Sequence, residues 1–242
     1  GYNANEIVHK IDRAIKNYYE IPDNYEIEFT GEQEEQAETM DFLSWALFIA
    51  IALIFLIIVM QFNSVGKPVI IMTQIVFSVI GVLLGFIIFN MEISVVLTGM
   101  GIISVAGIVV KNAIILIDYT DILIKEVPRP REAIIRAGAT RLTPVILTAA
   151  STIFGLLPLA IGMNINFLTL FSEFDPNIYF GGESTIFWSP LAWTIIFGLA
   201  FATFLTLVVV PAMYFIIYAG QVKIKRSKQT KSLKEQMHYR YR

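Results

Sequence analysis

The sequence predicts an all-α polytopic membrane protein with five transmembrane helices and a short N-terminal α/β unit. Of the 242 residues, 56% are hydrophobic and 16% are charged, whereas a soluble domain usually has about 25% charged residues. The apolar residues fall into five runs of roughly 20 residues or more, each long enough to cross a hydrocarbon core of about 30 Å as a helix. The basic residues gather in alternate connections between these runs, as expected when a chain crosses a bilayer repeatedly.

The N-terminal residues 1–31 are typical of a soluble unit. Apolar residues recur at helical spacing as far as Tyr18, and Pro22 then ends the helix. Residues 25–29 alternate between polar and apolar and predict a half-buried strand. One helix and one strand cannot bury a core, so we expect this unit to pack against other parts of a longer protein. We also interpret the start at Gly1, rather than Met, as a truncation or a cut fragment.

Residues 32–218 form the predicted transmembrane domain. An acidic segment, 32–41, leads into the first apolar run. The predicted helices cover residues 42–62, 69–89, 95–117, 144–163 and about 190–218. Runs of this length with at most one charged residue are rare in soluble proteins, and five of them in one chain argue against a soluble fold.

Lysine and arginine predict how the helices are oriented. The connections 63–68 and 118–143 and the tail 219–242 contain basic residues, whereas the connections 90–94 and 164–189 contain none. Since basic residues favour the cytoplasmic side, we expect the N-terminal unit outside and the tail in the cytoplasm. We interpret the tail as a disordered orientation signal, with contact to anionic lipid as the alternative.

The connection 164–189 is aromatic as well as acidic. We interpret it as an aromatic belt at the outer membrane surface, where such rings concentrate. A role in admitting substrate is the alternative, and the sequence alone does not assign one.

Lys111 is the only charged residue in the run 95–117. A lysine near the centre of a membrane helix costs roughly 2.5–3.5 kcal/mol on insertion scales. Its ammonium group either reaches the cytoplasmic surface along its own side chain or pairs with a carboxylate on another helix. The five runs contain no carboxylate, and Asp118 lies two helical turns away. A partner for Lys111 is therefore expected outside this chain.

Arg141 and Thr148 are seven residues apart and share one face of a helix. Facing Lys111, they would line a hydrated proton path. The alternatives are an ordinary cytoplasmic arginine and a threonine hydroxyl bonded to its own helix. Pro144 is expected in the first turn of this helix, where its missing N–H is tolerated.

Small residues predict close contacts between membrane helices. The candidates are Gly81, Gly85, Gly99, Gly101 and Gly107. A small residue every four positions lets two helix backbones approach closely.

Several stretches resemble a known family. Residues 107–118 contain Lys111 and Asn112, and residues 136–144 contain Arg141. Together with residues 62–68 and 155–159, they resemble the C-terminal part of the resistance–nodulation–division (RND) efflux permeases, in the hydrophobe/amphiphile, or multidrug, branch. The resemblance covers nearly the whole chain and implies spans eight to twelve of a twelve-span permease. Residues 1–31 would then end a periplasmic porter subdomain.

The resemblance implies a proton relay. In this family two aspartates on span four pair with a lysine on span ten, and here that lysine is Lys111, followed by Asn112. The relay arginine and threonine on span eleven correspond to Arg141 and Thr148. The implied function is drug/proton antiport by a secondary transporter, not an enzyme, which uses protons and no cofactor. The alternatives are lipid handling or assembly, and heavy-metal efflux.

The resemblance also implies partners and a location. The implied partners are the N-terminal part of the permease with its span-four carboxylates, a periplasmic adaptor, an outer-membrane channel and the lipid bilayer. The permease is expected to form a homotrimer, and no nucleic acid is expected as a partner. The protein is expected in the bacterial inner membrane, with a periplasmic N-terminus and a cytoplasmic C-terminus. The heavy-metal branch usually has an acidic residue near the position of Lys111, so its absence favours organic substrates. The connection 164–189 is longer than is usual in the family.

Overall fold

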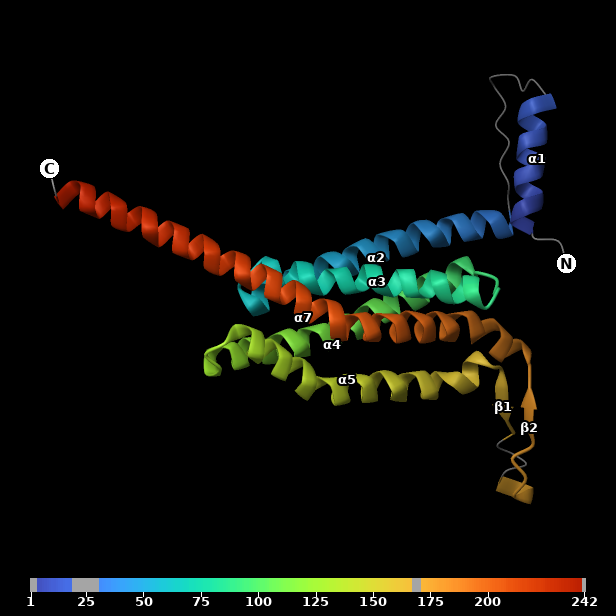
Figure 1. The fold of residues 1–242 in the computed structure, drawn as a ribbon. Coiled ribbons are helices and arrows are strands. Elements are labelled where there is room, and N and C mark those ends of the chain that lie inside the picture. Colours follow the sequence, from blue (N-terminus) through green and yellow to red (C-terminus); the bar gives the residue numbers. More distant parts are fainter. Residues whose placement is uncertain (1–3, 19–30, 167–170, 241–242) are drawn as a thin grey trace.

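The computed structural model describes residues 4–18, 31–166 and 171–240. Six long helices fill most of these ranges (Figure 1): α1 Ala4–Tyr18, α2 Glu32–Phe62, α3 Gly66–Ile88, α4 Val95–Glu126, α5 Pro130–Ala160 and α7 Glu183–Arg240. Two short strands, β1 Met163–Ile165 and β2 Ile178–Phe180, lie between α5 and α7. The strand predicted at 25–29 lies outside the described residues.

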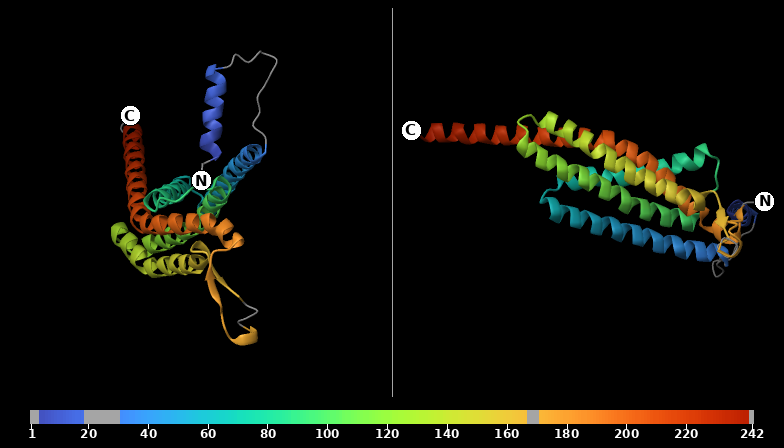
Figure 2. Two further views of the ribbon diagram at one scale, coloured as in Figure 1. Left: turned by 90° about the vertical axis from the view of Figure 1, so that its right-hand side faces the viewer. Right: turned by 90° about the horizontal axis from the view of Figure 1, so that it is seen from below.

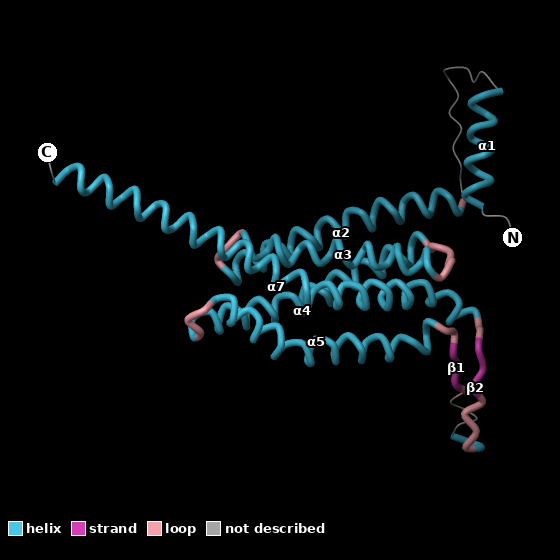
Figure 3. Tube along the Cα trace, viewed as in Figure 1, coloured by secondary structure: helices cyan, strands magenta, loops and turns pink. Residues whose placement is uncertain are grey.

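Five of the described helices, α2 to α5 and α7, are long and apolar enough to cross a membrane. They run side by side as a bundle, and helix dominates the trace in Figure 3. One end of the bundle carries the α2–α3 turn, the α4–α5 turn and the C-terminal part of α7, and the other end carries the α3–α4 turn and the two strands. The predicted fold class, an all-α polytopic membrane protein, is confirmed.

Several helices extend beyond their apolar runs. The helix α2 begins at Glu32 rather than 42, and α5 begins at Pro130 rather than 144. The prediction that Pro144 lies in a first helical turn is wrong, because Pro130 takes that position and Pro144 lies inside α5. The polar extensions are rich in Glu, Gln, Arg and Ala, which favour helix in water as well, so the apolar run marks only the part of each helix inside the bilayer.

The C-terminal helix α7 also continues past the membrane. Its apolar part, Glu183–Gly220, is followed without a break by helix as far as Arg240. The expectation of a disordered tail is therefore wrong for residues 219–240. After Gly220 the sequence contains neither Gly nor Pro and is rich in Lys, Arg and Gln, which explains why the helix does not end there.

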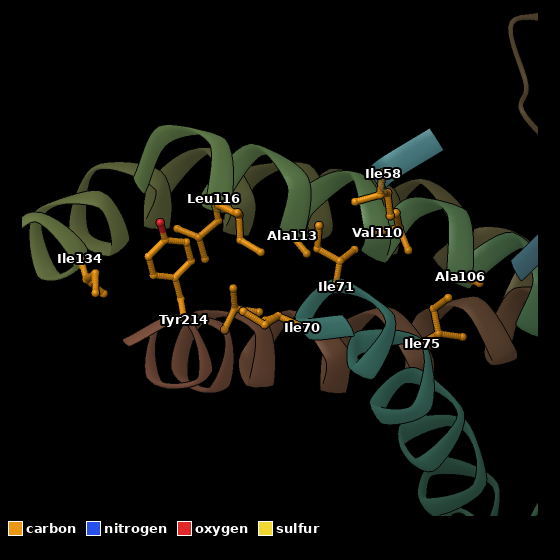
Figure 4. Packing of buried hydrophobic residues seen from close by; sticks show 12 residues of the cluster. Ile58, Ile70, Ile71, Ile75, Ala106, Val110, Ala113, Leu116, Ile134 and Tyr214 are labelled. Carbon is orange, nitrogen blue, oxygen red and sulfur yellow. The ribbon is translucent and has the colours of Figure 1, made fainter. Parts of the chain in front are cut away.

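The helix α7 forms the centre of the bundle. The largest buried cluster joins Ile58 of α2, Ile70 and Ile71 of α3, Leu116 of α4 and Tyr214 of α7, and Figure 4 shows their side chains meeting between the helices. A second cluster joins α4, α5 and α7. The helix α2 lies at the edge, since only 11% of its apolar window is buried.

Glycines allow α3 and α4 to pack closely against α7. A Cβ atom added at Gly81 would overlap the side chain of Phe201, and one at Gly85 would overlap Phe197. A Cβ at Gly101 would lie 2.6 Å from Thr194 of the same helix α7. At each of these positions a larger side chain would push the helices apart.

The other two candidate glycines differ from each other. A Cβ at Gly99 would lie 2.9 Å from Leu43 of α2. At Gly107 no described atom lies within 4 Å of the added Cβ. Any helix that packs closely on Gly107 therefore lies outside the described chain.

The connection 164–189 contains a β-hairpin that the sequence did not predict. The strands β1 and β2 are antiparallel, with Met163 opposite Phe180, and they extend away from the bundle (Figure 2, left). At their base the Asn164 side-chain amide donates to the carbonyl of Gly181 at 2.6 Å. Beyond the strands, Phe171 and Phe174 are 79% and 90% exposed. The aromatic belt remains a prediction.

Candidate functional site

One face of α4 is exposed along the length of the bundle. Ser104, Gly107, Lys111, Ile115 and Asp118 follow one another at intervals of three or four residues and are all exposed. This spacing places them on one stripe of the helix. Lys111 therefore lies on a face that no other described helix covers.

The opposite face of α4 is buried. Val105, Val109 and Ala113 belong to the hydrophobic clusters that α4 shares with α3, α5 and α7. Asn112 lies on this buried side with 6% of its surface exposed. Consecutive residues of a helix point about 100° apart, so Lys111 and Asn112 do not share a face. Lys111 can meet a charged partner from outside the bundle, whereas Asn112 is within it.

Within the described residues, Lys111 has no ion pair or hydrogen bond. Asp118 lies on the same stripe, two turns further on. Asp121 is already engaged, because it accepts hydrogen bonds from Lys67 of α3 and Tyr214 of α7. Among the described residues no carboxylate pairs with Lys111, and a partner outside this chain stays a prediction.

Arg141 of α5 lies against α4. Its guanidinium carbon is 4.3 Å from the centre of the Tyr119 ring, within the range of a cation–π interaction. Its Nε atom is buried and has no hydrogen-bond partner among the described residues. Arg141 thus differs from an ordinary exposed arginine, because it attaches α5 to α4.

Thr148 is exposed, and its hydroxyl donates to the carbonyl of Val145 in its own helix at 2.9 Å. The structure therefore contains the hydrogen bond to its own helix that the alternative interpretation of Thr148 expects. The helices α4 and α5 are antiparallel neighbours, and Arg141 of α5 contacts Tyr119 of α4. Thr148 comes seven residues after Arg141, and Asn112 comes seven residues before Tyr119, so Thr148 lies at the level of Asn112. Thr148 and Lys111 consequently lie at about the same depth on adjacent helices.

Two polar contacts were missed at the sequence level. The first is the Lys67–Asp121–Tyr214 group at the turn end of the bundle. The second is a hydrogen bond of 2.8 Å from the Thr206 hydroxyl to the Gln74 side-chain oxygen, with both residues buried. Gln74 is a polar residue inside an apolar run and could have been noticed, but the spacing of 54 residues between Lys67 and Asp121 has no local signature.

In the part of the chain that the structure describes, no group of three or more His, Cys, Asp or Glu side chains is placed to bind a metal ion. The candidate site is instead the ammonium group of Lys111 on α4, with Thr148 at about the same depth on the neighbouring helix α5.

The chain is similar to two bacterial proteins. It is 36% identical over 197 residues to the swarming motility protein SwrC of Bacillus subtilis (strain 168), which covers 81% of this chain and 17% of that protein. It is 28% identical over 236 residues to the multidrug resistance protein MdtC of Escherichia coli O157:H7 (strain EC4115 / EHEC), covering 95% of this chain and 21% of that protein.

The fold is also known from solved structures. A crystal structure of a heavy metal efflux pump matches with a TM-score of 0.71 and 24% identity, covering 90% of this chain and 20% of that one. The chain spans about a fifth of the length of these relatives. The profile described as the AcrB/AcrD/AcrF family matches residues 2–218. With its five membrane-spanning helices, the chain belongs to the AcrB/AcrD/AcrF family of RND efflux permeases and is part of a multi-pass membrane protein.

Proposed function

We propose that this chain supplies the basic half of the proton relay in a drug/proton antiporter. The observation that carries the proposal is the exposed position of Lys111 on the stripe of α4 that no described helix covers. A charge in the bilayer is costly unless it is paired, so this stripe is where carboxylates from the rest of the permease would bind.

The coupling follows from the charge of the pair. While the carboxylates are ionised, their attraction for Lys111 offsets the cost of removing both charges from water. When a proton neutralises a carboxylate, that attraction is lost and the ammonium group moves to other partners. A local protonation then biases the helix packing between two arrangements.

Arg141 and Thr148 would assist Lys111 from α5. Arg141 is attached to Tyr119 of α4, so it would transmit a movement of one helix to the other. The Thr148 hydroxyl lies at the depth of Lys111 and is exposed, which suits a role beside water on a proton path. Asn112 is buried and would act by positioning α4 rather than by contact with protons.

The substrates we propose are hydrophobic or amphiphilic organic compounds. The similarity to a multidrug resistance protein supports this class. Heavy-metal efflux is the second candidate, since the matching structures are of heavy metal efflux pumps. Transport of dyes and detergents, compared with resistance to silver, copper and zinc salts, distinguishes the two.

We further propose that the turn end of the bundle is cytoplasmic, with the N-terminus periplasmic. Lys67 at the start of α3 and Arg129 in the α4–α5 turn lie at this end, and the basic C-terminal part of α7 leaves from it. A trimer, a periplasmic adaptor and an outer-membrane channel follow from the resemblance to the family. Labelling of single cysteines, placed in this cysteine-free sequence, by a membrane-impermeant reagent in whole cells tests the orientation.

The decisive experiment is Lys111→Ala in the full-length permease. The variant should insert normally and lose proton-driven efflux of a fluorescent dye in inverted membrane vesicles. Lys125→Ala is the matched control, because Lys125 is an exposed lysine at the end of the same helix, and it should transport normally.

Normal dye efflux by Lys111→Ala would overturn the proton-relay proposal. Normal growth and insertion, with no dye efflux even by the wild type, would instead favour lipid handling or assembly.

A further inference from the structure

An open groove lies where the α4–α5 turn meets α7. Its volume is about 570 Å³, and its lining includes Arg129, Arg131, Phe215, Tyr218, Ala219 and Val222. A second groove of about 280 Å³ is lined by Ile134, Ile135, Pro211 and Ala212, and it shares Arg131 and Phe215 with the first. The two form one trough between α5 and α7, named here the arginine groove.

The floor of the arginine groove is a stripe of α7. Ala212, Phe215, Ala219 and Val222 are separated by three or four residues and lie on one side of the helix. The two alanines leave room on either side of the Phe215 ring. From Pro211 to Val222 the helix rises about 16 Å, which is about half of a hydrocarbon core of about 30 Å. The groove is therefore as long as one leaflet is thick.

The groove has two charged residues in its lining, Arg129 in its first part and Arg131 where the two parts meet. Arg129 and Arg131 are exposed, and neither makes an ion pair with another described residue. Of the neighbouring carboxylates, Glu132 is bound to Arg136 at 2.6 Å, and Glu126 is exposed at the end of α4. Since no acidic residue lines the groove, Arg129 and Arg131 leave a positive charge in an otherwise apolar groove.

We propose that the arginine groove binds one anionic phospholipid. The guanidinium groups of Arg129 and Arg131 bind the phosphate of the headgroup, as planar donors in a basic pocket between membrane helices do. An acyl chain lies along α7 beside Phe215 and the two alanines. The bound lipid fixes the α4–α5 turn to α7 at the basic end of the bundle.

Native mass spectrometry of the full-length permease in detergent tests this proposal. The probes are palmitoyl-oleoyl phosphatidylglycerol and the zwitterionic phosphatidylcholine with the same acyl chains. The wild type should retain phosphatidylglycerol more tightly. Arg129→Gln and Arg131→Gln should each weaken its binding roughly fivefold, and the double variant roughly thirtyfold, since each basic residue adds about 1 kcal/mol at an anionic surface. Lys125→Gln, an exposed charge outside the groove lining, should change the binding less than twofold.

A further variant, Ala219→Phe, fills the groove and keeps both arginines. It should lose the lipid as well, because the acyl chain no longer fits. Equal binding of both lipids by the wild type would overturn the proposal. This result is expected if another part of the permease occupies the groove. An equal loss in Lys125→Gln, or unchanged binding in Ala219→Phe, would also overturn the proposal.

Discussion

The Asp121 carboxylate accepts a hydrogen bond from the Lys67 ammonium, and this ion pair joins α4 to the beginning of α3. The other oxygen of the same carboxylate accepts from the Tyr214 hydroxyl of α7. One aspartate thereby ties three helices together at the turn end of the bundle. The Lys67 ammonium also lies 5.3 Å from the centre of the Phe62 ring at the end of α2.

Asp121→Asn should destabilise the bundle. The amide keeps the shape of the side chain but loses the charge, and hydrogen bonds to charged groups contribute about 1.5–3 kcal/mol. We expect a loss of about 2 kcal/mol, measured by thermal unfolding of the full-length permease in detergent. Asp118→Asn is the matched control: Asp118 is exposed and should change the unfolding temperature little. Equal shifts for the two variants would show that the Lys67–Asp121–Tyr214 group does not stabilise the fold.

Gly85→Leu should separate α3 from α7. Its side chain would overlap Phe197, and overpacking of this kind costs about 1–3 kcal/mol. Gly155→Leu provides the control, because no described atom lies within 4 Å of a Cβ at Gly155. We expect lower thermal stability and lower membrane yield for Gly85→Leu only.

The Gln74–Thr206 hydrogen bond should show coupling in a double-mutant cycle. Within membrane bundles such bonds contribute about 0.6 kcal/mol on average and up to about 1.7 kcal/mol. Gln74→Leu alone leaves the Thr206 hydroxyl its bond to the Ala202 carbonyl, so its loss should be moderate. The pair Gln74→Leu/Thr206→Val should lose less stability than the sum of the single changes. Strict additivity in chemical unfolding would contradict the contact.

Arg141→Lys should impair function even though it keeps the charge. A lysine cannot place a planar guanidinium over the Tyr119 ring, where the observed separation is 4.3 Å. We expect reduced dye efflux in vesicles with normal insertion. Tyr119→Leu should reproduce the defect, whereas Arg136→Lys, at an exposed position of α5 five residues before Arg141, should not. Full activity of Arg141→Lys would show that the cation–π contact is dispensable.

The sequence was most informative where a residue conflicts with its surroundings. Lys111 was identified because a charge in an apolar run has no local explanation, and the structure places it on an exposed stripe. Gly81 and Gly85 were identified by their spacing, and they meet Phe201 and Phe197. The ends of the helices were predicted poorly at α2, α5 and α7. Hydropathy indicates which residues lie in the bilayer, but it does not indicate where a helix ends.

By itself, the sequence determined that five helices cross a membrane. Unpaired backbone polar groups are costly in lipid, so an apolar run of about 20 residues crosses it as a helix. It also determined that one lysine, Lys111, lies within an apolar run. Only the tertiary structure decided which face of each helix is covered. That packing buried Asn112 and left Lys111 exposed. It also brought Asp121 to Lys67 and Tyr214 and formed the arginine groove. These contacts join residues far apart in the chain, so they depend on how the helices pack and leave no periodic pattern in the sequence.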